Sequence, residues 1–498
     1  MATEIELKFR IPAPRLAALQ RAVATARAEQ QPLAAAYFDT PGQHLAQARM
    51  ALRLRREGDA WVQTLKAEGS GPLQRLEHNV PVAGAGRPAL DIARHDGSAA
   101  GNALRRLLAD AGQPPLQERY ATSVLRTRRV LRSGAAVVEL ALDVGEVRAG
   151  DRHVPLCEIE FELLSGPPQA LLALAGRWVA RHGLLLDMRS KSELGHTLAA
   201  GLPGSPPTLA RPLRLDRQAD LDRARAAMLS NTLRQVLANA SQMAAGPSES
   251  EHLHQLRVGL RRLRSVLGAA WPADADCAAD DPLPPMRAAL AALSRPLGAA
   301  RDADALGEGL WPALQAAGAP PLPAAPVSGS APPDPAALLR APATQQLWLA
   351  LIALGLPSDG AVPAATSPPA ASALAGPLQR LWRQVRRDAR RFDSLDDEAC
   401  HRLRRRIKRL RYLTELGSGL WPDKPAARLL QRLKPAQQAL GERNDTAVAL
   451  AHGRSLVAQD PQAWFAVGWL TARQDALRPA CAAALRRLGR ATPPWKRR

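Results

Sequence analysis

The segment Glu4–Arg10 alternates charged and apolar side chains without interruption, and this alternation constrains the fold more than any other feature of the chain. Because successive side chains of a strand point to opposite faces, the segment predicts a strand with one apolar and one charged face. The charged face carries Glu4, Glu6, Lys8 and Arg10. A single strand of this kind is typical of the solvated side of an antiparallel sheet.

The same alternation recurs in later segments of the first 200 residues, which weakens that simple interpretation. Basic side chains follow it in segments 52–55, 62–66 and 73–77 and at residues 126 and 128, and acidic side chains follow it in segments 138–143 and 157–163. A solvated face usually mixes both signs of charge along each strand. We therefore predict one enclosure whose opposite walls carry opposite charge.

The acidic wall needs a counter-ion. Two carboxylates about 4 Å apart repel each other by roughly 4 kcal/mol at the effective dielectric constant of a protein surface. A divalent cation compensates this repulsion, and ligands that offer only oxygen favour Mg²⁺ or Mn²⁺ over Zn²⁺. The opposite wall carries more positive charge than a small carboxylate substrate requires, so a metal-chelated polyphosphate fits both walls.

The first 200 residues resemble the CYTH family, the triphosphate tunnel metalloenzymes, and within it the bacterial inorganic triphosphatases most closely. The resemblance rests on the ExExK motif at Glu4, Glu6 and Lys8 and on the segments 52–55, 64–66, 141–147, 155–166 and 190–191. It implies an eight-stranded antiparallel β-barrel that is open at both ends, with a charged interior and helices outside. The amphipathic stretches near residues 14–28 and 167–183 are suitable for such helices.

The resemblance also implies a role for each charged residue in the cleavage of a triphosphate. The predicted metal ligands for one or two Mg²⁺ or Mn²⁺ ions are Glu4, Glu6, Glu158 and Glu160. The predicted substrate-binding residues are Arg53, Arg55, Lys66, Arg126 and Lys191. Lys8 is expected near the phosphate that is attacked, and Asp143 or Glu139 is expected to activate water. Glu162 is either a further metal ligand or the end of its strand, and Arg128 and Arg75 are either substrate-binding or structural.

The second half of the chain begins after a break at residues 201–207, which are rich in proline and glycine. Beyond the break the apolar period changes from two residues to three or four, which predicts helices. An internal repeat is visible here, because HxxRxxxRRxR at 254–264 matches HxxRxxxKRxR at 401–411. A second pair, LGxxxD at 297–302 and 440–445, follows in the same order and predicts two related helical bundles.

Histidine and arginine side chains three and four residues apart lie on one helix face in both copies, where like charges destabilise an isolated helix. They either cover apolar surface and pair with acids, or bind an anion; the six arginines at 380, 383, 386, 387, 390 and 391 favour the anion. Asp302 and Asp445 are expected to orient these side chains. This half resembles the CHAD family, which implies a basic groove for inorganic polyphosphate. The polyphosphate-binding residues would be His254, Arg257, Arg261, Arg262, Arg264, His401, Arg404, Lys408, Arg409 and Arg411.

The fold class predicted from these patterns is α+β, with the tunnel domain at residues 1–203, a linker at 204–212 and an all-helical domain at 213–498. The repeats cover about 213–311 and 378–498, and a Pro/Ala-rich insertion covers about 312–377, where residues 345–356 could form one helix. The formal net charge of +21 indicates a polyanionic partner. Four dispersed cysteines and the lack of a long apolar run predict a cytoplasmic protein without disulfides or membrane contact, which could associate with polyphosphate granules.

These features together predict a metal-dependent inorganic triphosphatase whose helical half binds polyphosphate. A non-catalytic polyphosphate-binding protein is one alternative. A hydrolase or cyclase acting on nucleoside or thiamine triphosphate is another, because the motifs describe the shared phosphates and not the leaving group. Nucleic acid is expected to bind only non-specifically, since an aromatic content of 4% leaves little for base stacking.

Overall fold

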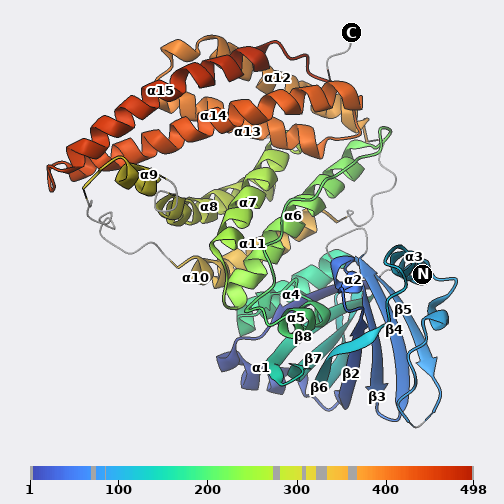
Figure 1. Cartoon of the computed structure of the whole chain (residues 1–498). Coiled ribbons are helices and arrows are strands. Elements are labelled where there is room, and N and C mark those ends of the chain that lie inside the picture. Colours follow the sequence, from blue (N-terminus) through green and yellow to red (C-terminus); the bar gives the residue numbers. More distant parts are fainter. Residues whose placement is uncertain are drawn as a thin grey trace. The chain divides into compact units, whose positions relative to one another are not determined.

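The computed structural model describes residues 4–68, 74–84, 86–272, 281–305, 310–320, 334–356 and 367–495. It divides into two compact units (Figure 1). The first unit contains residues 1–209, 233–256 and 336–360, and the second contains residues 210–232, 257–335 and 361–498. Our boundaries at residues 203 and 213 remain predictions, because residues 233–256 and 336–360, which follow both boundaries, belong to the first unit.

The first unit is built on one large antiparallel sheet. Its strands are β1 (Glu4–Arg10), β2 (Glu29–Asp39), β3 (Ala51–Glu57), β4 (Ala60–Glu68), β5 (Gln74–Val82), β6 (Gln117–Ser133), β7 (Ala136–Ala149), β8 (Arg152–Ser165) and β9 (Leu185–Leu186). The strand order is β5-β4-β3-β2-β6-β7-β8-β1-β9, and β1 also pairs with β5 through Glu4↔Arg75 and Ile5↔Gln74. The described sheet therefore has nine strands and not the predicted eight, because Leu185–Leu186 pairs with the end of β1.

The alternation in the sequence separates the two faces of this sheet as predicted. The apolar side chains Leu7, Phe9, Leu140 and Phe161 are all at most 1% exposed. They lie on the face covered by α4 (Pro168–His182), where the ring of Trp178 lies 5.6 Å from that of Phe161. Burying each large apolar side chain contributes about 1.5–3 kcal/mol, which holds this helix on the sheet. The expected outer helices are thus confirmed at α4 and at α1 (Leu16–Val23).

Three further helices of the first unit, α2 (His44–Gln47), α3 (Ala99–Asp110) and α5 (Lys191–Ala199), pack on other parts of the sheet. Helix α3 buries Leu104 and Leu108 against Leu52 and Leu65 of β3 and β4. Helix α5 packs Leu194 and Leu198 against a cluster on the opposite, charged face, which Figure 1 shows beside β6–β8. One end of the charged face is therefore covered by apolar side chains.

Helices make up the rest of the described chain, as predicted. They are α6 (Leu221–Ala245), α7 (Ser250–Ala270), α8 (Leu283–Ala305), α9 (Trp311–Ala316), α10 (Pro335–Arg340), α11 (Pro342–Leu354), α12 (Ala370–Arg390), α13 (Asp397–Leu416), α14 (Asp423–Leu456) and α15 (Ala463–Gly489). Helix α11 confirms the helix expected inside the insertion, parts of which, 321–333 and 357–366, lie outside the described residues. The first copy of the repeat lies on α7 and α8, and the second lies on α13 and α14.

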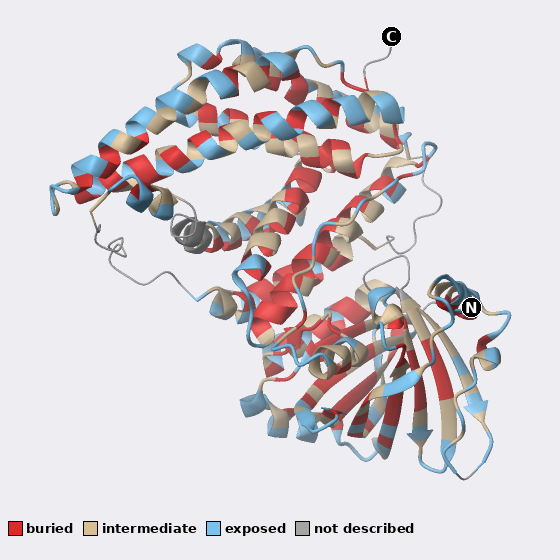
Figure 2. Ribbon diagram, viewed as in Figure 1, coloured by how far each residue is buried: buried red, intermediate tan, exposed pale blue. Residues whose placement is uncertain are grey.

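A hydrophobic core of the second unit is formed by α12–α15 together with parts of α6 and α7, and it appears as red segments of these helices in Figure 2. Trp382, Ile407 and Leu433 are each at most 1% exposed in this core. Among the described residues no helix combines the length and hydropathy needed to cross a membrane. Cys157, Cys400 and Cys481 are free thiols, and Cys277 lies outside the described residues.

Candidate functional site

Strand register brings the predicted acidic residues of β7, β8 and β1 onto one face. Asp143 lies opposite Glu158, and Glu160 lies opposite Lys8. Because directly opposed residues of antiparallel strands share a face, this charged face continues from strand to strand. Glu139 and Glu6 both lie opposite Glu162 and extend the face further along the strands. The side chain of Glu4 lies outside the described residues.

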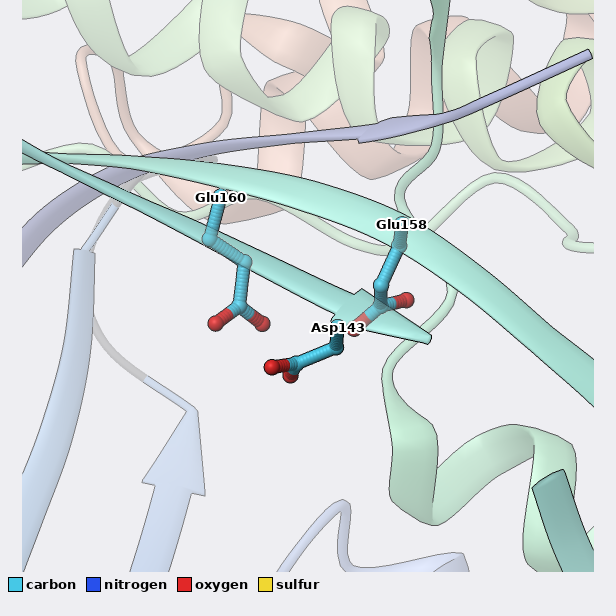
Figure 3. Close-up of side chains that lie close together, drawn as sticks. All are labelled: Asp143, Glu158 and Glu160. Atoms are coloured by element: carbon cyan, nitrogen blue, oxygen red, sulfur yellow. The ribbon is translucent and has the colours of Figure 1, made fainter. Parts of the chain in front are cut away.

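Three carboxylates form the centre of the charged face. Asp143, Glu158 and Glu160 each place one oxygen within 4.8 Å of the others, and Figure 3 shows all three side chains emerging on the same side of β7 and β8. Asp143 is 0% exposed and Glu158 is 3% exposed. Three carboxylates this close together, two of them buried, require compensating positive charge. We call these three residues the acidic triad.

Three cations of the chain supply that charge. The Lys191 ammonium lies 2.8 Å from Asp143 Oδ2 and 2.9 Å from Glu160 Oε1 and also contacts Glu158. The Arg126 guanidinium lies 2.8 Å from Glu160 Oε2 and also binds Asp143. Lys8 Nζ donates to Glu158 Oε2 at 3.0 Å. The predicted separation into one acidic and one basic wall is thus wrong for these three cations. Closely spaced carboxylates repel one another, so the three cations lie between them.

The ion pairs determine the protonation of Asp143, Glu160 and Lys191. Burial alone would raise the pKa of Glu160, but Lys191 and Arg126 hold that pKa well below its usual value. The same two cations outweigh burial at Asp143 and lower its pKa as well. In turn, the three acids outweigh burial at Lys191 and raise its pKa well above the usual value. Asp143 and Glu160 are therefore ionised at neutral pH and offer oxygen ligands to a cation.

The predicted substrate-binding residues of β3 and β4 lie on the same face of the sheet, in strands that β2 and β6 separate from β7. Arg53 is 8% exposed and donates from Nη1 to the Tyr37 hydroxyl at 3.3 Å. Lys66 forms an ion pair with Glu77, and Arg55 forms one with Glu57. The Nε–H groups of Arg53 and Arg55 are buried and have no hydrogen-bond acceptor within the described part of the chain. These two groups can therefore donate to an anion.

Exposure increases along β6 from one end of the charged face to the other. Tyr120 is 3% exposed and stacks on Tyr37 beside α5, with ring centroids 4.7 Å apart. The Arg126 side chain is 19% exposed and that of Arg128 is 51% exposed. Arg128 lies 2.8 Å from Glu29 and 4.0 Å from Glu139. The face is thus closed by aromatic rings near α5 and solvated near Arg128.

Some residues that shape this site were not predicted from the sequence. Tyr37 contacts Arg53, and Glu77 contacts Lys66. Asp187 accepts two hydrogen bonds from the Arg189 guanidinium, and the Arg189 carbonyl accepts one from Lys8 Nζ. The sequence offers a signal for Asp187 and Arg189, because these two charged residues closely precede the predicted site residue Lys191.

The repeated helices bring part of the predicted polyphosphate-binding set together. Burial lowers the pKa of Lys408 to about 7, assisted by Arg404 and Arg261, against the opposing effect of Asp445, with a smaller contribution from Arg257. These four cations on α7 and α13 thus lie close enough to affect one another, and we call them the basic cluster. Arg404 Nη2 lies 3.3 Å from Asp445 Oδ1, as expected for that aspartate, and the side chain of Asp302 lies outside the described residues.

The remaining predicted residues have other surroundings. The buried Arg262 donates to Asn231 at 3.0 Å, and Arg409 lies against Gly268. Arg411 lies 3.7 Å from Glu415. His401 Nδ1 lies 2.5 Å from Asn444 Oδ1. Of the other two, Arg264 is exposed and His254 is half-buried on α7. Arg262, Arg411 and His401 therefore each have a partner within the helical part of the chain.

Comparison with known proteins supports the division of the chain. A family model of the CYTH domain matches residues 2–193, and one of the CHAD domain matches residues 227–454. An inorganic triphosphatase from Haemophilus influenzae is 31% identical over 170 residues, which cover 33% of this chain and 45% of that relative. This chain thus matches less than half of the length of that relative.

Two solved structures resemble separate parts of the chain. The CHAD domain from the plant Ricinus communis is 31% identical with a TM-score of 0.48, and the match covers 58% of this chain and 99% of that domain. A putative adenylyl cyclase from Hippeastrum, described as having a dominant triphosphatase activity, is 18% identical with a TM-score of 0.28 over 40% of this chain and 96% of that one. The two family models show that the chain contains a CYTH domain and, after it, a CHAD domain.

Proposed function

We propose that the first unit hydrolyses inorganic triphosphate in a metal-dependent reaction on the charged face, with the curved sheet acting as a tunnel. The observation that carries this proposal is the acidic triad with Lys8, Arg126 and Lys191 in contact with it. The inorganic triphosphatase that is 31% identical over 170 residues supports it. Phosphoryl transfer depends mainly on positioning and on neutralising charge, and both can be supplied here.

The acidic triad fits a divalent metal ion. Its ligand atoms are all carboxylate oxygens, and the buried Glu158 Oε1 is already in contact with a cation, the Lys191 ammonium. Oxygen ligands of this kind suit Mg²⁺ or Mn²⁺. Asp143, Glu158 and Glu160 would hold the ion, with Glu4 and Glu6 as the further ligands that the motif implies. A bound metal ion supplies charge neutralisation at the transferring phosphoryl group.

The cations of the chain would bind the triphosphate oxygens. Arg53 and Arg55 have buried Nε–H groups that can donate to them, and Lys66, Arg126 and Lys191 add positive charge on the same face. Lys8 lies beside the triad and would contact the phosphate that is attacked. Both oxygens of Asp143 accept hydrogen bonds from Arg126. We therefore assign the orientation of the attacking water to Glu139, and Arg128 to the solvated end of the substrate.

Phosphate release from a panel of triphosphates tests this proposal. The intact chain is incubated with inorganic triphosphate, ATP or thiamine triphosphate and with Mg²⁺ or Mn²⁺. We expect inorganic triphosphate to be hydrolysed fastest and Glu160→Gln to abolish the release. If the chain released no phosphate from any of these compounds with either metal, the enzymatic proposal would be wrong. Faster release from an organic triphosphate would change the assigned substrate alone.

We further propose that the helical half binds inorganic polyphosphate through the basic cluster. Like charges gathered from two helices repel one another, so a polyanion that neutralises several of these four cations at once binds favourably. Burial is the main cause of the lowered pKa of Lys408, and repulsion from Arg404, Arg261 and Arg257 adds to it. Retention of the intact chain on immobilised polyphosphate at physiological salt, with duplex DNA as competitor, tests the proposal. Equal competition by DNA would indicate a non-specific polyanion surface.

A further inference from the structure

Three side chains from the CHAD region hold the segment that leads into α5. Leu186 N donates to Gln345 Oε1 at 2.8 Å, and Met188 N donates to Ser241 Oγ at 3.1 Å. Ser241 Oγ also donates to the Leu186 carbonyl at 3.2 Å. Ser241 lies on α6 and Gln345 lies on α11, and both helices fall within the CHAD match although these parts of them belong to the first unit.

Gln242 makes the third connection and is central to it. Its Oε1 accepts from Arg189 Nη1 and from Ser205 N, each at 3.1 Å, and its Nε2 donates to the Pro247 carbonyl at 2.7 Å. Gln242 is 2% exposed and Arg189 is 7% exposed. Loss of the hydrogen bond from Arg189 Nη1 leaves the buried guanidinium with an unpaired donor, which is costly for a charged group.

The segment held in this way contacts Lys8 and leads into Lys191, and both lysines form ion pairs with the acidic triad. The Arg189 carbonyl accepts a hydrogen bond from Lys8 Nζ, and Asp187 N donates to the Lys8 carbonyl at 2.9 Å. Lys191 begins α5 two residues after Arg189. The position of both ammonium groups therefore depends on where the backbone of residues 186–189 lies.

We infer that Gln242, with Ser241 and Gln345, is a positioning residue for the proposed triphosphate site. The CHAD region acts on the reaction through these three side chains, which fix residues 186–189 and thereby Lys8 and Lys191. This inference rests on the proposed function of the first unit. It assigns to the CHAD region a contribution to catalysis that is separate from polyanion binding.

The test compares three variants of the full chain. Gln242→Leu removes the acceptor for Arg189, and Gln242→Glu keeps an oxygen acceptor there. Gln235→Leu is the matched control, because Gln235 is an equally buried glutamine two turns earlier on α6 that donates to Gln255. The melting temperature, the kcat and KM for triphosphate, and the triphosphate Kd by calorimetry are measured for each.

We expect Gln242→Leu to lower kcat/KM about tenfold to a hundredfold, since a misplacement of about 1 Å can cost about 100-fold in rate. Gln242→Glu should restore most of the loss, and Gln235→Leu should keep the activity while losing as much thermal stability as Gln242→Leu. Equal kcat/KM in the two leucine variants, or no rescue by glutamate, would overturn the inference. If the unmodified chain were inert, the proposed function would fall, and the same comparison of Kd would decide whether Gln242 positions a binding site. Absence of both turnover and binding would overturn both.

Discussion

Arg126 and Asp143 form a two-pronged ion pair in which Nε donates to Oδ1 and Nη2 donates to Oδ2, each at 2.7 Å. Asp143→Asn removes the negative charge from this pair and from the proposed metal site. We expect phosphate release to fall at least about 100-fold, as for loss of other preorganised charges in active sites. Mn²⁺ binding should weaken about tenfold to a hundredfold.

The matched control for that change is Asp151→Asn. Asp151 is exposed at the turn between β7 and β8, and its substitution changes the net charge by the same amount. Phosphate release is measured by a colorimetric assay and Mn²⁺ binding by electron paramagnetic resonance. An Asp143→Asn chain with full activity would remove Asp143 from the site.

Lys191 and a metal ion would use the same carboxylate oxygens. The ammonium contacts all three members of the acidic triad, so Lys191→Met leaves them with less positive charge. We expect Mn²⁺ to bind about tenfold more tightly to this variant without substrate, while the KM for triphosphate rises. Titration calorimetry with Mn²⁺ gives the first quantity. Lys424→Met, at an exposed position on α14, is the control. Unchanged or weaker Mn²⁺ binding would contradict this competition.

Polyphosphate binding should depend on pH through Lys408. Burial and the neighbouring arginines lower the pKa of Lys408 to about 7, so its charge is lost as the pH rises through 7. A bound polyanion favours the charged form and raises that pKa, so binding takes up a proton and weakens towards alkaline pH. A rise of about 1 pKa unit corresponds to about a tenfold change in affinity between pH 6 and pH 9.

Lys408→Arg provides the comparison for this pH effect, because the first copy of the repeat has arginine at the matching position, Arg261. Arginine stays charged throughout this range. The variant should therefore bind polyphosphate with a flatter pH profile, which fluorescence anisotropy of a labelled polyphosphate would measure. The same slope in both chains would indicate that Lys408 does not face the polyanion.

Charge reversal should separate the two proposed functions. The double change Arg257→Glu and Arg404→Glu inverts two of the four charges in the basic cluster, and we expect retention on polyphosphate to be lost while triphosphate turnover stays within about twofold. The double change Arg428→Glu and Arg432→Glu, on the exposed side of α14, alters the net charge by the same amount. This control variant should still be retained on polyphosphate. Loss of retention in both variants would indicate that overall charge, and not the cluster, binds the polyanion.

The two-residue period of the sequence predicted the sheet well, because side-chain parity and strand pairing express the same geometry. Glu158 and Glu160 share a face as soon as they lie in one strand, and their pairing with Asp143 and Lys8 follows from neighbouring strands. The repeat likewise predicted matching surroundings: Arg257 lies close to Gly298 as Arg404 lies close to Gly441. A glycine at each position leaves room for the guanidinium.

Other features depend on contacts between segments far apart in the sequence, and no local pattern contains them. The ninth strand is too short to show a period. The contacts of Gln242 and Gln345 with residues 186–189 join positions more than 50 residues apart. The placement of Lys8 and Lys191 among the acids follows from electrostatic compensation in the folded state, which the list of charged residues alone leaves open.

The ring of Tyr120 fills the space beside Gly195, where a Cβ atom would come 2.0 Å from the ring. Tyr120 also donates to Ser192 Oγ at 2.7 Å, so the helix that begins with Lys191 is held against this ring. A single methyl group added at residue 195 would push that helix outward and carry its ammonium away from the carboxylates. The substitution Gly195→Ala would therefore lower the activity as a change in the active site does, although residue 195 carries no functional group.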